Sequence, residues 1–226
     1  MTFRLLVAAC SALLLPAAQA ADAPTAQQVQ DWWKAKSSEA MTLDEPLQEV
    51  HLMNKEVAFI APVGFYQRGR NDTLHAVLIR PELHEVRELP YPVGDKLSVQ
   101  DIDGDGVSEL LSTSISSGQG TTSSVRAIVR LDGFTPIVMH AVVEDENLGN
   151  CYPSCDQVSV DWKFGQHPQT GEPTLTETVT FRKGKSPDHL TARKEVRRYM
   201  LMQNTFVRAD SFGLRYSDET KPRKAR

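Results

Sequence analysis

Residues 158–164 read Val158-Ser159-Val160-Asp161-Trp162-Lys163-Phe164. Apolar side chains take every second position, and polar side chains fill the positions between them. Because successive side chains of an extended strand point to opposite faces, this spacing predicts a half-buried β-strand. The stretch therefore indicates a sheet with one apolar face, and it sets the pattern to look for in the rest of the chain.

The same alternation recurs on both sides of this stretch. Turn-forming residues such as Asp132-Gly133 and Lys183-Gly184-Lys185 separate the alternating segments. Short strands joined by turns predict a mainly β fold, an antiparallel meander closed as a sandwich, a small barrel or a few propeller-like blades. The further predicted strands are 57–61, 74–79, 84–89, 96–100, 124–131, 136–143, 174–181 and 196–202. The polar segment 112–124 predicts a mobile loop.

One helical segment is expected, near the start of the chain. Within residues 25–41, Val29, Trp32, Trp33 and Met41 stand among Gln, Lys, Glu and Ala. The adjacent tryptophans predict a helix anchored to the sheet by its aromatic side, and a ligand platform is the alternative. The expected organisation is a signal peptide over 1–20, a helical segment over 21–45, a β domain over 46–216 and a basic disordered tail over 217–226.

The first twenty residues have the order of a secretory signal peptide. Arg4 precedes an apolar run from Leu5 to Ala18, and Ala18-Gln19-Ala20 forms an A-x-A cleavage site. The run is shorter than the roughly 20 residues of a membrane-spanning helix. Cys10 ends a stretch that resembles a lipobox, but the apolar residues between it and Arg4 are too few for the usual apolar region. These features predict a periplasmic or secreted protein without a transmembrane segment.

Cleavage after Ala20 would remove Arg4 and Cys10. The remaining chain carries 24 basic and 29 acidic residues, a formal net charge of -5, which disfavours nucleic acid as a partner. Cys151 and Cys155 would be the only cysteines left. Because disulfides persist in oxidising compartments, the three-residue spacing predicts a local disulfide; a redox or soft-metal pair is the alternative.

The segment with the clearest chemistry is Asp101-Ile102-Asp103-Gly104-Asp105-Gly106-Val107-Ser108-Glu109. Oxygen ligands at its positions 1, 3, 5 and 9, with the carbonyl of Val107 at position 7, suit calcium, which takes six to eight hard oxygen ligands. The three aspartates repel one another unless a cation lies among them. The sequence therefore predicts a Ca²⁺ site made by Asp101, Asp103, Asp105, Val107 and Glu109, with a degenerate loop or an acidic turn as the alternative.

The loop is similar to the first half of an EF-hand, but Ser112 stands where the bidentate Glu would be, and both flanks are predicted strands. It resembles more closely the FG-GAP or VCBS-type repeat, whose D-x-D-G-D-G-x-x-E/D loop joins two strands in exported bacterial proteins and in integrin propellers. This resemblance covers about residues 97–133 and a single copy of the motif. It implies Asp101, Asp103, Asp105 and Glu109 as side-chain ligands in a β-hairpin, and a family of mostly binding and scaffolding domains.

No motif of a known catalytic type stands out in the sequence. The six histidines are scattered, and the chain has no G-x-S-x-G, H-E-x-x-H or phosphate-binding glycine loop. The expected function is an exported, calcium-stabilised, non-enzymatic binding domain whose partner is another exported or periplasmic protein. The alternatives are an inhibitor or immunity-type protein that caps a toxin or hydrolase, and a calcium-dependent hydrolase.

Overall fold

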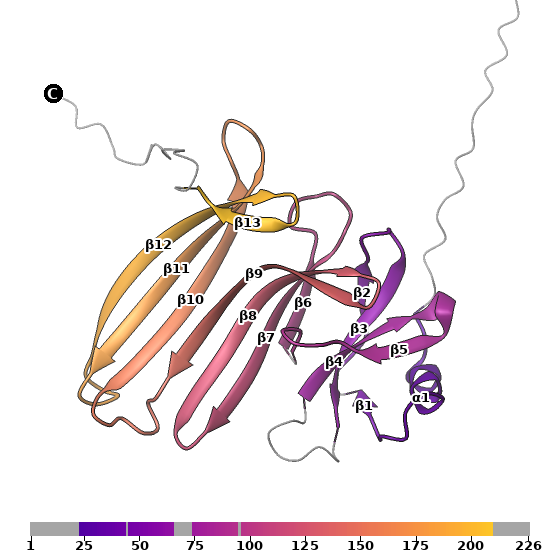
Figure 1. The fold of residues 1–226 in the computed structure, drawn as a ribbon, viewed down its shortest axis with the longest axis horizontal. Helices are drawn as coiled ribbons and strands as arrows, with labels where there is room; N and C mark the ends of the chain where they lie inside the picture. Colours follow the sequence, from indigo (N-terminus) through magenta and orange to yellow (C-terminus); the bar gives the residue numbers. More distant parts are fainter. Residues whose placement is uncertain (1–22, 44, 66–73, 95, 210–226) are drawn as a thin grey trace, which may run out of the picture.

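The computed structural model describes residues 23–43, 45–65, 74–94 and 96–209. The predicted leader 1–20, with Cys10, and the predicted tail 217–226 lie outside the described residues. Two antiparallel sheets make up most of the structure, and one α-helix packs at its N-terminal end (Figure 1). The predicted mainly β, antiparallel architecture is confirmed, and the described strands do not close into a barrel.

The N-terminal sheet has five strands in the order β1-β3-β4-β5, with β2 also paired to β3. Its central strands β3 and β4 are joined by an antiparallel ladder from Phe59↔Ile79 to Gly64↔Leu74. The strands are β1 (Thr42–Leu43), β2 (Gln48–His51), β3 (Val57–Gly64), β4 (Leu74–Arg80) and β5 (Glu85–Glu88), and the short 3-10 helix η1 (Pro81–Leu83) links β4 to β5.

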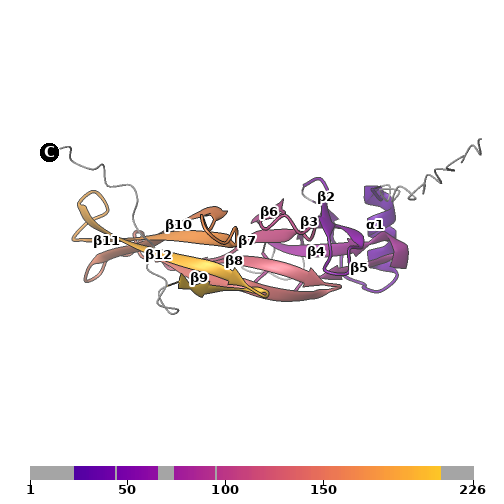
Figure 2. The ribbon, with the colours of Figure 1, turned by 90° about the horizontal axis from the view of Figure 1, so that it is seen from above.

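The C-terminal sheet has eight strands in the order β13-β12-β11-β10-β9-β8-β7-β6, an uninterrupted meander. Its strands are β6 (Lys96–Gln100), β7 (Glu109–Gly118), β8 (Thr121–Asp132), β9 (Thr135–Glu146), β10 (Cys155–Gln166), β11 (Pro173–Gly184), β12 (Leu190–Met202) and β13 (Thr205–Arg208). Figure 2 shows α1 and the N-terminal sheet at one end of an elongated molecule and β10–β12 at the other.

Helix α1 (Ala26–Lys34) begins at a capping box, in which Thr25 and Gln28 bond to each other's backbone amides. One turn apart, Val29 and Trp33 lie on one side of the helix and are buried against the N-terminal sheet. Trp32 packs against the same cluster. The tryptophans thus anchor the helix, as predicted, although α1 ends well before Met41.

The second face of the N-terminal sheet packs on the C-terminal sheet. Val50, Ile60 and Leu78 meet Leu110 and Val129 in this cluster. Because α1 covers one face of β3 and the second sheet covers the other, seven of the eight residues of β3 are buried. Strands covered on both sides read as continuous apolar runs, which explains why β3 lacks the alternation of β10.

A third cluster lies on the other face of β8. Ile128 and Met139 meet Leu175, Tyr199 and Phe206 there, so the far strands of the sheet turn toward its middle. The turn occurs between β9 and β10, which share the single register pair Gln157↔Glu146. Figure 1 shows the two strands diverging beyond that pair.

The prediction of a mobile loop over 112–124 is wrong. This segment forms the ends of β7 and β8, which pair from Leu110↔Val129 to Gly118↔Thr121. The turn between them uses Gln119 and Gly120, whose φ angles are 53° and 81°. Two positive φ values suit the twist of a two-residue hairpin turn. Serine and threonine therefore build a strand here because partner strands pair with them, against the expectation from composition.

Candidate metal centre

The acidic loop joins β6 to β7, and the antiparallel pair Gln100↔Glu109 closes it. Both flanks are strands, so the hairpin setting expected from the sequence is present. Gly104 and Gly106 have φ angles of 76° and 77°. A side chain at either position would be strained in this left-handed region, so glycine allows the chain to curl twice within three residues.

Backbone amides of the loop donate hydrogen bonds to the loop's own aspartate side chains. Asp101 accepts hydrogen bonds from the amides of Gly104 and Gly106, at 2.8 and 3.0 Å. The Asp105 carboxylate accepts one from the amide of Val107 at 2.7 Å. These bonds hold the aspartates in place before any ligand arrives. A carboxylate has about four lone-pair sites, so each keeps capacity for a cation.

Three carboxylates converge at the loop. Atoms of Asp101, Asp103 and Glu109 lie within 4.8 Å of one another. Hard oxygen donors of this type fit Ca²⁺, so the donor set is chemically suitable. Asp105 is not part of this group, and its side chain is 43% exposed. The carbonyl of Val107 as a ligand stays a prediction.

Arg130 of β8 reaches the same carboxylates. Its Nε lies 2.6 Å from Glu109 Oε1, and its Nη2 lies 2.6 Å from Asp103 Oδ2 and 3.2 Å from Asp105 Oδ2. The guanidinium is thus a cation that relieves the repulsion between Asp103 and Asp105, a role that the sequence analysis had given to a metal alone. The signal that could have found it is an arginine inside the apolar run 127–131.

Glu109 is the buried member of the group. Its side chain is 0% exposed, and its Oε2 accepts a hydrogen bond of 2.6 Å from the amide of Ile102. Burial raises the pKa of the Glu109 carboxyl, although this amide and Arg130 both favour its ionised form. Arg130 is thus the positive charge that opposes the effect of burial on this carboxyl.

The loop is tied to three distant parts of the chain. Lys55, in the turn before β3, donates to the carbonyl of Asp105. His51, at the end of β2, exchanges two bonds of 2.9 Å with Ser108. Arg130 also donates to Asn204, in the turn between β12 and β13, at 3.1 Å. Through these hydrogen bonds the conformation of the loop is coupled to both sheets.

A second polar cluster surrounds Glu177 of β11, whose side chain is 1% exposed. Its carboxylate accepts from His140 Nε2 at 2.8 Å and from Tyr199 at 3.1 Å. Burial alone would raise its pKa, but the hydrogen bonds from His140, Trp162 and Tyr199, with the charge of His140, lower the pKa to about 2. Such a carboxylate is an acceptor for the fold rather than a proton donor near neutral pH.

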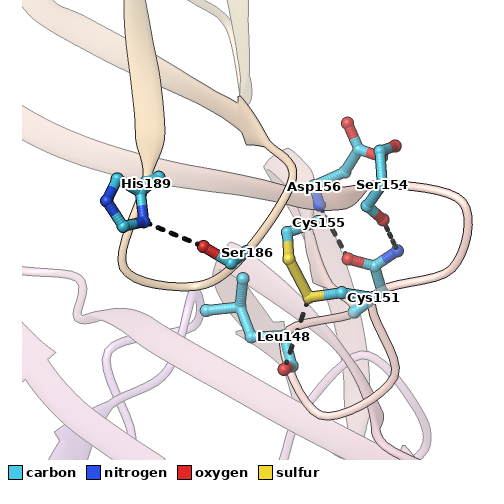
Figure 3. Close-up of a disulfide and its surroundings, with 8 residues drawn as sticks. Leu148, Cys151, Ser154, Cys155, Asp156, Ser186 and His189 are labelled. Atoms are coloured by element: carbon cyan, nitrogen blue, oxygen red, sulfur yellow. Dashed lines mark hydrogen bonds between the residues drawn. A yellow bond between two sulfur atoms is a disulfide. The ribbon is translucent and has the colours of Figure 1, made fainter.

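The predicted disulfide is present between Cys151 and Cys155, whose Cα atoms are 4.4 Å apart. Figure 3 shows it in the loop that precedes β10, close to Leu148. Asn147 closes the same loop, because its side chain donates to the carbonyl of Ser154 and accepts from the amide of Asp156. The cysteine pair is therefore structural in this state.

Comparisons with known proteins found nothing similar to this chain. No family model matches the chain, and searches of curated proteins and of solved structures return no match. Within the described residues, no helix has the length and apolar character needed to cross a membrane.

Proposed function

We propose that the loop 101–109 binds one Ca²⁺ ion and that the protein acts, after export, as a calcium-stabilised interaction domain. The observation that carries the proposal is the convergence of Asp101, Asp103 and Glu109 in a preorganised hairpin loop. The donors are hard oxygens, and calcium tolerates the irregular geometry that a short loop imposes. Magnesium demands a near-octahedral shell and dehydrates reluctantly, so it should bind more weakly.

The role proposed for calcium is structural. The loop contacts β2, the turn before β3 and, through Arg130, the β12–β13 turn, so an ion held there stiffens segments that are distant in sequence. The Cys151–Cys155 disulfide supports export, since such bonds persist in oxidising compartments. The partner proposed is another exported or periplasmic protein.

Calorimetric titration of the refolded, EDTA-treated protein tests the ion. We expect one Ca²⁺ per chain, and calcium at about 100 times Kd should add roughly 2.7 kcal/mol to the free energy of unfolding. Asp101→Asn keeps an oxygen for the Gly104 amide but removes a charge, so it should weaken binding at least tenfold. Asp145→Asn, on the exposed end of β9, is the matched control and should bind as the wild type does.

An absence of heat on titration, together with a melting curve that EDTA leaves unmoved, would show that Arg130 alone serves the loop. A pulldown from periplasmic extract with and without calcium tests the interaction role separately. A partner captured equally with and without calcium would support the interaction role and contradict the proposal that calcium stabilises the interacting form.

A further inference from the structure

The outer edge of β12 has no partner strand over residues 190–198 in the described part of the sheet. β12 pairs with β11 over eleven consecutive residues, from Gly184↔Leu190 to Thr174↔Met200, without a bulge. On its other side, β13 covers only Tyr199 to Met202. Figure 1 shows β12 at the margin of the molecule. Along residues 190–198, every second residue therefore presents its backbone N–H and C=O outward.

This edge is basic although the chain is acidic. Residues 190–198 carry Arg193, Lys194, Arg197 and Arg198 against the single acid Glu195, whereas the whole chain has a formal net charge of -4. Side chains alternate along a strand, so each face of β12 carries two of the four bases. The edge thus joins unused backbone hydrogen-bonding groups with a local excess of positive charge.

The two faces of the edge differ in how their charges are used. On one face, Arg197 bonds to Glu195 at 2.8 Å and lies 3.4 Å from Glu177, and Arg193 stacks over the Phe181 ring at 4.8 Å. On the opposite face, Lys194 is exposed and makes no ion pair with any described residue, and the neighbouring Val196 is 56% exposed. The side chains of a partner would therefore be recognised mainly by the face of β12 that carries Lys194.

We propose that the outer edge of β12 docks an extended acidic segment of another polypeptide, which adds a strand to the sheet. This inference rests on the proposed interaction role and names its surface and the chemistry of its partner. Backbone pairing supplies affinity in strand addition, and side chains at alternate positions supply specificity. A carboxylate of the partner would face the exposed Lys194.

The same features disfavour two other occupants. A second copy would bring an identical basic edge against this one, and like charges directly opposite each other are destabilising. A nucleic acid would satisfy the charges but has no peptide backbone to continue the ladder. The open backbone groups therefore favour a polypeptide.

Fluorescence anisotropy with short labelled peptides tests the docking. The probe is a nine-residue peptide that alternates Thr and Glu, compared with a Thr–Gln peptide and with a Thr–Glu peptide N-methylated at every second residue. We expect both changes to weaken binding at least tenfold, since one removes the charge and the other blocks backbone pairing. A twelve-residue oligothymidine is the polyanion control.

Variants locate the site on the sheet. Lys194→Glu should weaken the Thr–Glu peptide about tenfold. Lys163→Glu makes the same charge change on the same face of the sheet but on β10, two strands away from the outer edge of β12, and it should change binding less than twofold. Absence of binding by the Thr–Glu peptide, equal binding of the N-methylated peptide, or tighter binding of the oligonucleotide would overturn the proposal.

The calcium arm keeps this test separate from the metal proposal. The edge lies outside the loop 101–109, so Asp101→Asn in EDTA should still bind the Thr–Glu peptide within threefold of the wild type. Peptide binding by a wild-type protein that binds no calcium would sustain the edge proposal and reject the ion. Calcium binding without peptide binding would do the opposite.

Discussion

Replacing Arg130 by methionine separates the guanidinium's contribution to the loop from that of any metal. Methionine keeps an unbranched, mostly apolar side chain where Arg130 is 5% exposed, but it removes the charge that faces Asp103 and Glu109. Glu109, with a fully buried side chain, then has no cation beside it in EDTA. Breaking a buried ion pair by removing one partner costs about 3–5 kcal/mol.

Urea unfolding in EDTA measures this cost. With an m-value of about 2 kcal/mol/M, the midpoint should fall by about 1.5–2.5 M. Calcium should then stabilise Arg130→Met more than the wild type, because the ion takes over the neutralisation of Asp103 and Glu109 and no longer competes with a guanidinium. Calorimetry should accordingly give a lower Kd for the variant.

Arg126→Met is the matched control on the same strand. Arg126 lies four residues away on β8, stacks over Trp162 at 4.6 Å and does not contact the loop carboxylates. Its loss should destabilise the protein by the same amount with and without calcium. The reasoning fails if Arg130→Met is as stable as the wild type in EDTA. If Arg130→Met is destabilised but calcium does not change its stability, the role of the ion pair is supported and the proposed metal site is refuted.

Two further outcomes are expected from the structure and one from the sequence. The pKa of Glu177 is about 2, against the ordinary 4.5, so its ionised form contributes a stabilisation that is present above pH 4.5 and is lost, by about 3 kcal/mol, as the pH falls toward 2. Glu177→Gln should therefore flatten this part of the curve of unfolding free energy against pH. Parallel curves for the variant and the wild type would show that the partners of Glu177 do not favour its ionised form. Serine at both Cys151 and Cys155 should lower the unfolding free energy by about 2 kcal/mol, the value for so short a loop, and a variant with an unchanged melting temperature would contradict this. Mass spectrometry of the exported protein should find Ala21 as its first residue, and retention of residues 1–20 or a lipid on the chain would refute the leader.

Local patterns predicted much of the fold. The alternation that marks residues 158–164 located β10, and similar spacing located parts of β4, β8, β9 and β11. The hairpin of β7 and β8 was missed because its Ser- and Gly-rich ends lack the apolar alternation that marks a strand. The pairing that makes them strands depends on neighbours elsewhere in the chain. The start of β12 was missed for a related reason, since a solvated edge strand carries charges on both faces.

The acidic loop could be found from sequence because its donors lie within nine residues. Its cation was missed because Arg130 stands 21 residues beyond Glu109 and reaches it only when β7 and β8 pair, so its place inside an apolar run was the only sequence signal. The contact with Asn204 depends on the β12–β13 turn and is more remote still. Spacing along the chain reports local ligands well, whereas a long-range counter-ion is fixed by strand register.

Strand β8 has little solvent on either side over residues 127–131. Ala127 and Val129 belong to the cluster shared with the N-terminal sheet, and Ile128 belongs to the cluster shared with Leu175 and Tyr199. Cutting the chain on either side of this strand would expose one of its apolar faces to solvent. Neither half can then be a domain in its own right, and heat or denaturant should melt the two sheets in one transition.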